Sequence, residues 1–202
     1  MSKMLKIIGL GSSLLLASGL VFADQDAYRI DDSHSFANWT IRHVASKTSG
    51  TFSDIKGKIL IDRENLANSN VEAKINVLSV NSSHAKRDDH IKKEEYLDAA
   101  KFGEMIFVSK KVTSMNNTEG VLTGDLTLHG VTKEMTFPFK VLGFGSDPWG
   151  GYRMGIEART ALKASDFGFK WPLKPNPPVG DDIEITLLIE GVKLPTEIKA
   201  LK

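Results

Sequence analysis

The sequence predicts an all-β protein, an extended eight-stranded antiparallel barrel with one helix near the barrel end. Apolar and polar residues alternate along segments that Gly- and Pro-containing turns separate. Period-two alternation gives each strand one covered and one wet face, which is typical of antiparallel sheets. Many of the segments are near ~10 residues, longer than usual. Long strands in this number tend to close, because closure removes unpaired edges.

The first residues predict an export signal. Lys3 and Lys6 precede an apolar run over residues 7–22, and small residues lead to Ala23 just before an acidic residue. The run is shorter than the ~20 apolar residues of a membrane anchor. We expect residues 1–23 to be a signal peptide cleaved after about Ala23, and residues 24–202 to form a single domain. The expected location is a Gram-negative periplasm, with full secretion as the alternative.

The net charge and the cysteine content bear on which partners the protein can have and on what stabilises its fold. The chain has 26 basic and 25 acidic residues, and cleavage would remove Lys3 and Lys6, leaving 24 basic residues and a net charge of −1. Without a basic excess to neutralise phosphates, we expect no nucleic-acid partner. The sequence contains no cysteine, so the stability of an exported chain must come from packing.

Eight strands are expected in chain order. The clearest two form a hairpin, because alternation runs on through the turn at His129 and Gly130. The eight segments lie near residues 37–43, 55–61, 71–79, 105–113, 122–128, 131–141, 152–162 and 183–189.

Two segments depart from the alternating pattern. Residues 83–98 are polar, free of Gly and Pro and rich in helix formers, which predicts a helix with Arg87, His90, Ile91 and Glu94 along one stripe. A solvated surface helix and a helix that closes a barrel end both fit this stripe. Residues 166–181 contain four prolines and predict a stiff rim loop.

The inward faces predict an apolar lumen with isolated polar groups. His43 shares a face with Trp39 and Ile41, and Lys133 shares one with Met135. Small residues also fall on these faces, which favours a cavity for one small ligand, although a filled core is the alternative. These small residues are Ala37, Gly57, Ala73, Gly124 and Ala158.

Histidine spacing argues against a metal site. His84 and His90 would lie about 240° apart around a helix, and His34 and His43 would point to opposite faces of one strand. Neither pair has zinc-ligand spacing, and no cysteine can assist, so we expect no metal and no cofactor. The sequence also lacks a Gly-x-Ser-x-Gly nucleophile elbow, so we expect no enzyme activity.

Several ordered motifs resemble a known family over essentially the whole mature chain. They are HSFANWTIRH (34–43), RDDHI (87–91), LTGDLTLHGVTK (122–133), DPWGGYRMG (147–155), DFG (166–168) and VGDDIEI (179–185). They resemble the YceI family of periplasmic, lipocalin-like polyisoprenoid-binding proteins. The resemblance implies a barrel that holds a long isoprenoid in its lumen, often as a dimer. Trp39 stands where the family usually has Phe, and Ile91 where it usually has Leu.

Motif position places five residues in the lumen or at its mouth: Trp39, His43, Arg87, His90 and Phe167. Together with the alternating faces, the full ligand-binding set that we expect is Trp39, Ile41, His43, Arg87, His90, Leu126, Met135, Phe137 and Phe167.

The expected function is a non-enzymatic carrier whose ligand is a polyprenyl lipid or an isoprenoid quinone. Transient contact with the inner membrane and a homodimer are further expectations. Two alternatives remain: an enzyme acting on such a lipid with His43 as base, and an interaction protein that presents its Trp149 and Trp171 loops. The headgroup could be a diphosphate or a neutral quinone, and the lack of basic excess favours a neutral or weakly polar head.

Overall fold

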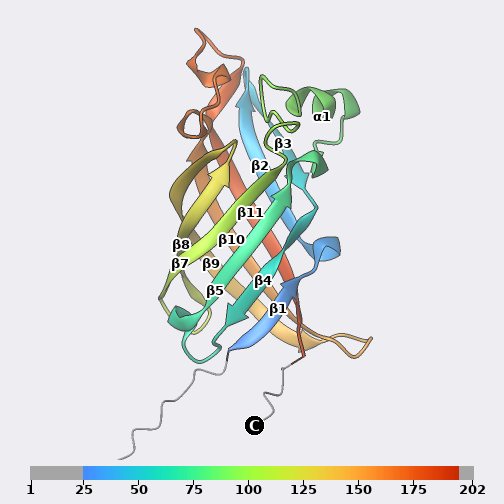
Figure 1. Ribbon diagram of the computed structural model, residues 1–202, viewed down its shortest axis with the longest axis vertical. Coiled ribbons are helices and arrows are strands. Elements are labelled where there is room, and N and C mark those ends of the chain that lie inside the picture. The colour runs from blue at the N-terminus through green and yellow to red at the C-terminus, as the bar shows by residue number, and fades with distance from the viewer. Residues whose placement is uncertain (1–24, 196–202) are drawn as a thin grey trace, which may run out of the picture.

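The computed structural model describes residues 25–195 and forms a closed antiparallel barrel of eight long strands, as the alternation predicted (Figure 1). The predicted signal peptide, residues 1–23, lies outside the described residues. Three of the eight long strands are interrupted and are each counted as two shorter ones. The strands are β1 (Asp26–Ile30), β2 (Phe36–His43), β3 (Ser46–Phe52), β4 (Ile55–Ile61), β5 (Asn70–Asn76), β6 (Val80–Asn81), β7 (Glu104–Ser114), β8 (Glu119–Leu128), β9 (Val131–Ser146), β10 (Tyr152–Lys163) and β11 (Val179–Lys193).

The last strand closes the barrel. β11 pairs with β10 along most of its length, and its other edge pairs first with β2 and then with β1. β1 and β2 therefore act as one long strand, broken at a short 3-10 helix, η1 (Asp32–His34), where Asp31 caps the turn. β3 with β4 and β5 with β6 form the other two broken strands. This arrangement gives every long strand a partner on both sides over part of its length.

One seam of the barrel is not hydrogen-bonded. β5 pairs with β7, but the short β6 that continues β5 pairs only with β3 among the described strands. Residues 82–103 bridge from β6 to β7 and contain α1 (Ala85–Ile91). Figure 1 shows α1 at the same end of the barrel as the β2–β3 turn and the connection between β10 and β11. We call this the helix end, and the opposite end, with the β9–β10 turn, the hairpin end.

The helix is shorter than predicted, because it ends at Ile91 rather than near residue 98. After Ile91 the chain folds back on itself: the Leu97 amide donates to the Ile91 carbonyl at 3.0 Å, and Asp98 adopts a φ of 45°. A polar helix of this kind has little apolar surface to bury, so turning Leu97 into the core is favoured over another helical turn. No described helix is long and apolar enough to cross a membrane.

The connection between β10 and β11 is built from two short 3-10 helices, η4 (Ala164–Phe167) and η5 (Trp171–Leu173). Gly168 ends η4 with a φ of 79°, a left-handed conformation that favours glycine. Two further 3-10 helices, η2 (Leu66–Asn68) and η3 (Val77–Ser79), flank β5.

Candidate functional site

An elongated apolar cavity of about 440 Å³ runs inside the barrel. This volume lies within the ~300–1,000 Å³ typical of small-ligand sites. The described strands contribute apolar side chains to its wall from all around the barrel. The apolar lining includes Ile30, Ala37, Phe52, Ile55, Ile59, Ile61, Val71, Ala73, Ile75, Phe107, Val112, Leu122, Phe139, Ile156, Ala158, Leu162, Ile183, Ile185, Leu187 and Ile189.

Packed aromatic and aliphatic side chains close the hairpin end. Tyr28 and Met154 are 0% and 1% exposed, and neither belongs to the cavity wall. The Phe144 ring lies 6.3 Å from the Tyr28 ring, and the Arg63 guanidinium lies 4.1 Å from the Phe144 ring centroid. Burial raises the pKa of the Tyr28 hydroxyl to about 12. Among the described residues, the packing around Tyr28 and Met154 closes the hairpin end.

The cavity reaches the surface at the helix end. His43 is exposed to solvent and also lines the cavity, as do Thr48 on β3 and Pro178 just before β11. Within residues 25–195, no hydrogen-bond partner is found for the His43 ring. Most polar groups of the wall thus lie at this mouth, and the rest of the wall is predominantly apolar, with Ser69 and Thr160 as polar exceptions.

Seven of the nine predicted ligand-binding residues line this cavity. Trp39 is 9% exposed and Phe137 7%, so both face inward as the alternation predicted. The seven are Trp39, Ile41, His43, Arg87, His90, Leu126 and Phe137.

The other two predicted residues, Met135 and Phe167, do not reach the cavity wall. Phe167 is 1% exposed and packs with Leu128 and Phe169 in a separate cluster at the helix end, against which Met135 also packs. The η4 turn carries Phe167 into this cluster. The family motif therefore indicated the correct end of the barrel, but the Phe167 side chain packs in the cluster and does not line the cavity. Lys133 was expected inside the barrel, yet it is exposed and pairs with Asp166 at 3.3 Å.

The sequence did not predict a chain of contacting aromatic rings beside the mouth. Six rings follow one another with centroid separations from 4.5 to 5.3 Å. Trp171 sits in the middle of the chain, lines the cavity and donates its indole N–H to the Gly180 carbonyl at 3.0 Å. The rings come from three separate segments, so spacing within the sequence carries no signal for them. In order they are Phe102, His129, Phe169, Trp171, Tyr96 and His90.

Two basic side chains at the mouth already have partners. The Arg87 guanidinium donates to the Ser82 hydroxyl at 2.7 Å and to the Ser82 carbonyl at 2.5 Å. His90 is hydrogen-bonded to the Glu95 carboxylate. The partners of Arg87 are thus the hydroxyl and the backbone carbonyl of a residue just before α1, not a carboxylate. These bonds use Nε and Nη2 of Arg87 and Nε2 of His90, so an anion at the mouth would have to bind through the remaining donors of the two side chains.

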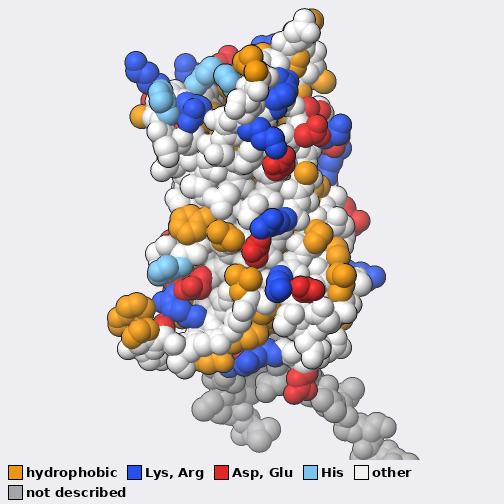
Figure 2. All heavy atoms as spheres, turned by 180° about the vertical axis from the view of Figure 1, so that it is seen from behind, with side chains coloured by type: hydrophobic (Ala, Val, Ile, Leu, Met, Phe, Trp, Pro, Cys, Tyr) orange, Lys and Arg blue, Asp and Glu red, His pale blue; other side chains and the backbone are white. Residues whose placement is uncertain are grey.

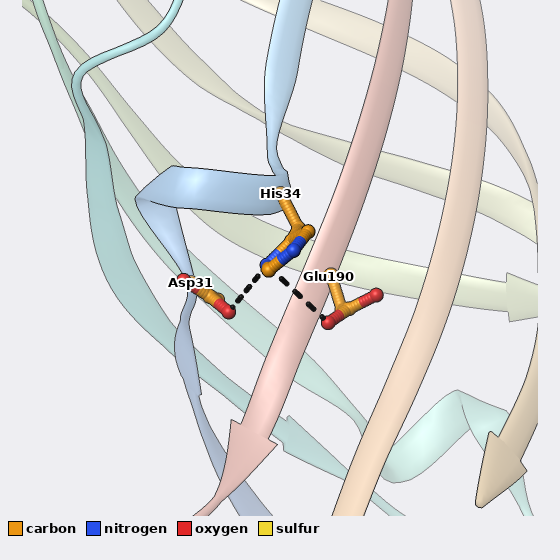
Figure 3. Close-up of side chains that lie close together, drawn as sticks. All are labelled: Asp31, His34 and Glu190. Carbon is orange, nitrogen blue, oxygen red and sulfur yellow. Dashed lines mark hydrogen bonds and ion pairs between the residues drawn. The ribbon is translucent and has the colours of Figure 1, made fainter. Parts of the chain in front are cut away.

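Outside the cavity, the fold brings Asp31, His34 and Glu190 together at the break between β1 and β2 (Figure 3). Their ligand atoms lie within 4.8 Å of one another, which is a geometry that could hold a metal ion. Arg153 occupies this position, however, because its guanidinium lies 2.6 Å from Asp31 and is also bonded to Glu190. A divalent cation would have to displace the guanidinium, so we interpret the group as a salt-bridge cluster that joins β1, β10 and β11.

Replacing Arg153 with methionine is expected to lower stability at neutral pH, and the loss should shrink in acid. Burial alone would raise the pKa of Asp31, but hydrogen bonds from Ser33, His34 and Arg153 outweigh it and hold the pKa well below its usual range. A carboxylate with a depressed pKa stabilises the fold above its unfolded pKa of ~3.9, and this contribution disappears as pH falls through the folded value. The urea midpoints of wild type and variant should therefore differ at neutral pH and should approach one another progressively as the pH falls below ~4.

The matched control for this prediction is Arg159→Met. Arg159 pairs with Glu157 on the same strand, but its side chain is 74% exposed. Exposed pairs contribute little, so its urea midpoint should follow wild type at both pH values. Equal effects of the two substitutions would contradict the role assigned to the cluster.

The fold and cavity together define a small closed barrel built to enclose an apolar ligand. Residues 28–191 match the model of the YceI-like domain, so the chain belongs to the YceI family. A UPF0312 protein from Pseudomonas fluorescens is 38% identical over 196 residues, which cover 96% of this chain and 98% of that protein.

Two solved structures share the fold. BcnA from Burkholderia cenocepacia superposes with a TM-score of 0.70 at 19% identity, covering 80% of this chain and 98% of that one. A polyisoprenoid binding domain from Saccharophagus degradans, implicated in plant cell wall breakdown, superposes with a TM-score of 0.63 at 13% identity, covering 83% and 98%. At these identities the likeness concerns the fold alone.

Proposed function

We propose that this protein is a non-enzymatic periplasmic carrier that holds an isoprenoid lipid or isoprenoid quinone in its barrel. The observation that carries the proposal is the cavity itself, whose wall is predominantly apolar along its length and has most of its polar groups at one mouth. Burying an apolar chain in such a cavity is favourable, because it removes that chain from water. The family membership and the polyisoprenoid binding domain of similar fold support the same ligand class.

The bound molecule is proposed to have a neutral or weakly polar head. A diphosphate cannot be buried unpaired, and the two basic groups at the mouth, Arg87 and His90, already bond to Ser82 and Glu95. A quinone carbonyl needs only a donor, which the exposed His43 ring or the Thr48 hydroxyl can supply. The mouth thus suits a carbonyl or hydroxyl better than a phosphate.

This proposal predicts that affinity hardly changes with ionic strength. Recognition of charge by partly exposed groups weakens as salt rises, whereas burial of an apolar tail does not. Titrations with a quinone at low and at ~0.5 M salt should give Kd values within about threefold, and Arg87→Ala should leave this profile flat. A steep loss of affinity with salt that Arg87→Ala abolishes would establish a diphosphate site instead.

Lipid extraction and mass spectrometry of natively purified protein test the function directly. We expect a stoichiometric isoprenoid lipid or quinone in the extract. Titrating delipidated protein with that lipid should quench Trp39, measured in a variant in which the other tryptophans, Trp149 and Trp171, are replaced by Phe. An extract without such a lipid, together with no quenching, would overturn the proposal.

The two alternatives gain no support from the geometry. An enzyme with His43 as base needs a group that orients the imidazole, and within residues 25–195 no carboxylate forms an ion pair with it. An interaction protein that uses both tryptophan loops needs them on one surface. Trp149 is 81% exposed near the hairpin end, whereas Trp171 packs into the ring chain at the helix end.

A further inference from the structure

We propose that the helix end docks on an anionic membrane surface through two apolar tips, Val44 and Leu173. The inference rests on the proposed lipid-carrier function and deepens it, since it names the surface through which a lipid would pass between a bilayer and the cavity. We call this surface the docking rim and define it as the β2–β3 turn, residues 43–46, together with residues 170–178.

The backbone conformation and the exposed side chain of Val44 are the first evidence that the docking rim contacts another surface. Val44 and Ala45 form a two-residue hairpin turn between the paired residues His43 and Ser46. Val44 has a φ of 51°, a left-handed conformation in which a β-branched residue is an outlier and where Asn or Gly is preferred. Its side chain is 61% exposed, so no packing within the barrel compensates for the strain. An exposed and strained valine is explained if its side chain serves a contact outside the chain.

Leu173 presents a second apolar tip on the same rim. Its side chain is 72% exposed at the end of η5, between Lys170 and Lys174. The base of this turn is fixed, because the Trp171 ring packs against the Phe169 ring and donates a hydrogen bond to the Gly180 carbonyl. A rigid base holds Leu173 outward instead of letting it collapse onto the barrel.

The two tips belong to one surface beside the cavity mouth. The Val44 amide donates to the Pro178 carbonyl at 2.7 Å, and the Arg42 guanidinium donates to the Pro177 carbonyl at 3.0 Å. His43 and Pro178, the neighbours of these contacts, both line the cavity. A bilayer that received the tips would therefore lie directly against the mouth.

The charge around the tips fits anionic headgroups. Residues 42–48 and 166–178 carry four basic side chains and one acidic one, Asp166, which pairs with Lys133. Lys47 pairs with Glu184, but no carboxylate in the described part of the chain forms an ion pair with Lys170 or Lys174. Basic and hydrophobic side chains lie next to one another at the upper end of the molecule in Figure 2, with acidic side chains among them. Small apolar tips with flanking lysines suit a lipid surface better than a protein partner, which would require a broad complementary patch.

Co-sedimentation with vesicles tests the docking rim. The vesicles contain roughly three parts phosphatidylethanolamine to one part phosphatidylglycerol, with pure phosphatidylcholine for comparison. Val44→Asn and Leu173→Ser should each lower the partition coefficient by about tenfold, the effect of losing one buried aliphatic side chain. Replacing Lys170 and Lys174 with serine should lower binding to the anionic vesicles only and flatten its salt dependence. Val44→Asn should also melt at or above the wild-type temperature, because asparagine adopts the left-handed conformation readily.

Matched controls lie at the other end and on another wall of the barrel. Trp149→Ser and Leu142→Ser remove side chains that are 81% and 58% exposed, and both should bind vesicles like wild type. Unchanged binding by the two tip variants, or binding lost in Trp149→Ser, would overturn the docking rim. Affinity of the tip variants for farnesol, measured by Trp39 quenching without vesicles, should equal that of wild type. Failure of wild type to bind farnesol or any extracted isoprenoid would instead count against the carrier function.

Discussion

Replacing Ala158 with phenylalanine is expected to lower the affinity for lipid about a hundredfold while the barrel stays folded. Ala158 lies in mid-strand on β10, is paired with Leu187 and Phe139, and lines the cavity. A ring at this position would project across the lumen and exclude the ligand's tail. Losing three to four buried CH₂ groups costs ~2.7 kcal/mol, which lowers affinity about a hundredfold. The cavity supplies room for the ring, so the ~1–3 kcal/mol cost of overpacking should largely be avoided.

Ala161→Phe provides the control on the same strand. Ala161 is exposed and faces outward, opposite Glu184, so an added ring there leaves the lumen open. Quinone titration and thermal melting of both variants form the experiment. Wild-type affinity in Ala158→Phe would show that the ligand does not occupy the lumen, and loss of affinity in Ala161→Phe would place it on the outer wall.

Strand period explains why most of the barrel was predictable. The inward position of Trp39, Ile41 and Ala158 follows from alternation alone, because neighbouring side chains of a strand must point to opposite faces. The number of long strands followed from the count of alternating segments. Neither conclusion depends on contacts between residues that are distant in sequence.

Alternation did not reveal the interrupted halves of the long strands. β3 reads SKTSGTF, in which polar and small residues leave no apolar period, and its pairing is set by β2 through the turn at Val44. β1 is separated from β2 by η1, where the Asp31 side chain caps a 3-10 turn. Such segments form strands because they pair with neighbouring strands, and a single sequence does not show which strands will be adjacent.

Alternation along a strand predicted which face of the sheet a side chain occupies, but not how far along the barrel that side chain lies. Met135 shares a face with Phe137, yet Phe137 lines the cavity and Met135 packs against the cluster around Phe167 at the barrel end. The same limitation hid the salt-bridge cluster, since Arg153 and Asp31 are 122 positions apart. Both outcomes depend on how the β10–β11 connection and the broken first strand fold over the barrel.

Replacing Trp39 with alanine is expected to have the largest effect on stability and to weaken lipid binding as well. The indole lies on Gly50 of the neighbouring strand, since a Cβ atom built at Gly50 would fall 2.4 Å from Trp39 Cζ2. Truncation would leave this stretch of wall uncovered and remove a large buried apolar surface, which costs ~3–5 kcal/mol. Trp39 borders the cavity on one side and lacks packed neighbours there, so the lower part of this range is expected.

The variant Trp39→Phe distinguishes two effects of the truncation. One is the loss of the side chain that covers this part of the cavity wall, and the other is the loss of the indole N–H. The Trp39 Nε1 is buried and has no hydrogen-bond partner in the described part of the chain. A phenylalanine still covers Gly50 and removes this unpaired donor, whose burial costs ~1–3 kcal/mol, so Trp39→Phe should lose less than ~1.5 kcal/mol. Trp149→Ser removes an 81% exposed indole and should change the free energy of unfolding by less than ~0.5 kcal/mol.

Urea denaturation and quinone titration of the three variants decide the role of Trp39. The expected order of stability is wild type and Trp149→Ser, then Trp39→Phe, then Trp39→Ala, with affinity falling in the same order. Unchanged unfolding and affinity in Trp39→Ala would mean that the side chain lies on the outer surface. Because a one-residue register shift moves every side chain of a strand to the other face, that result would also displace Ile41 and His43 from the lumen.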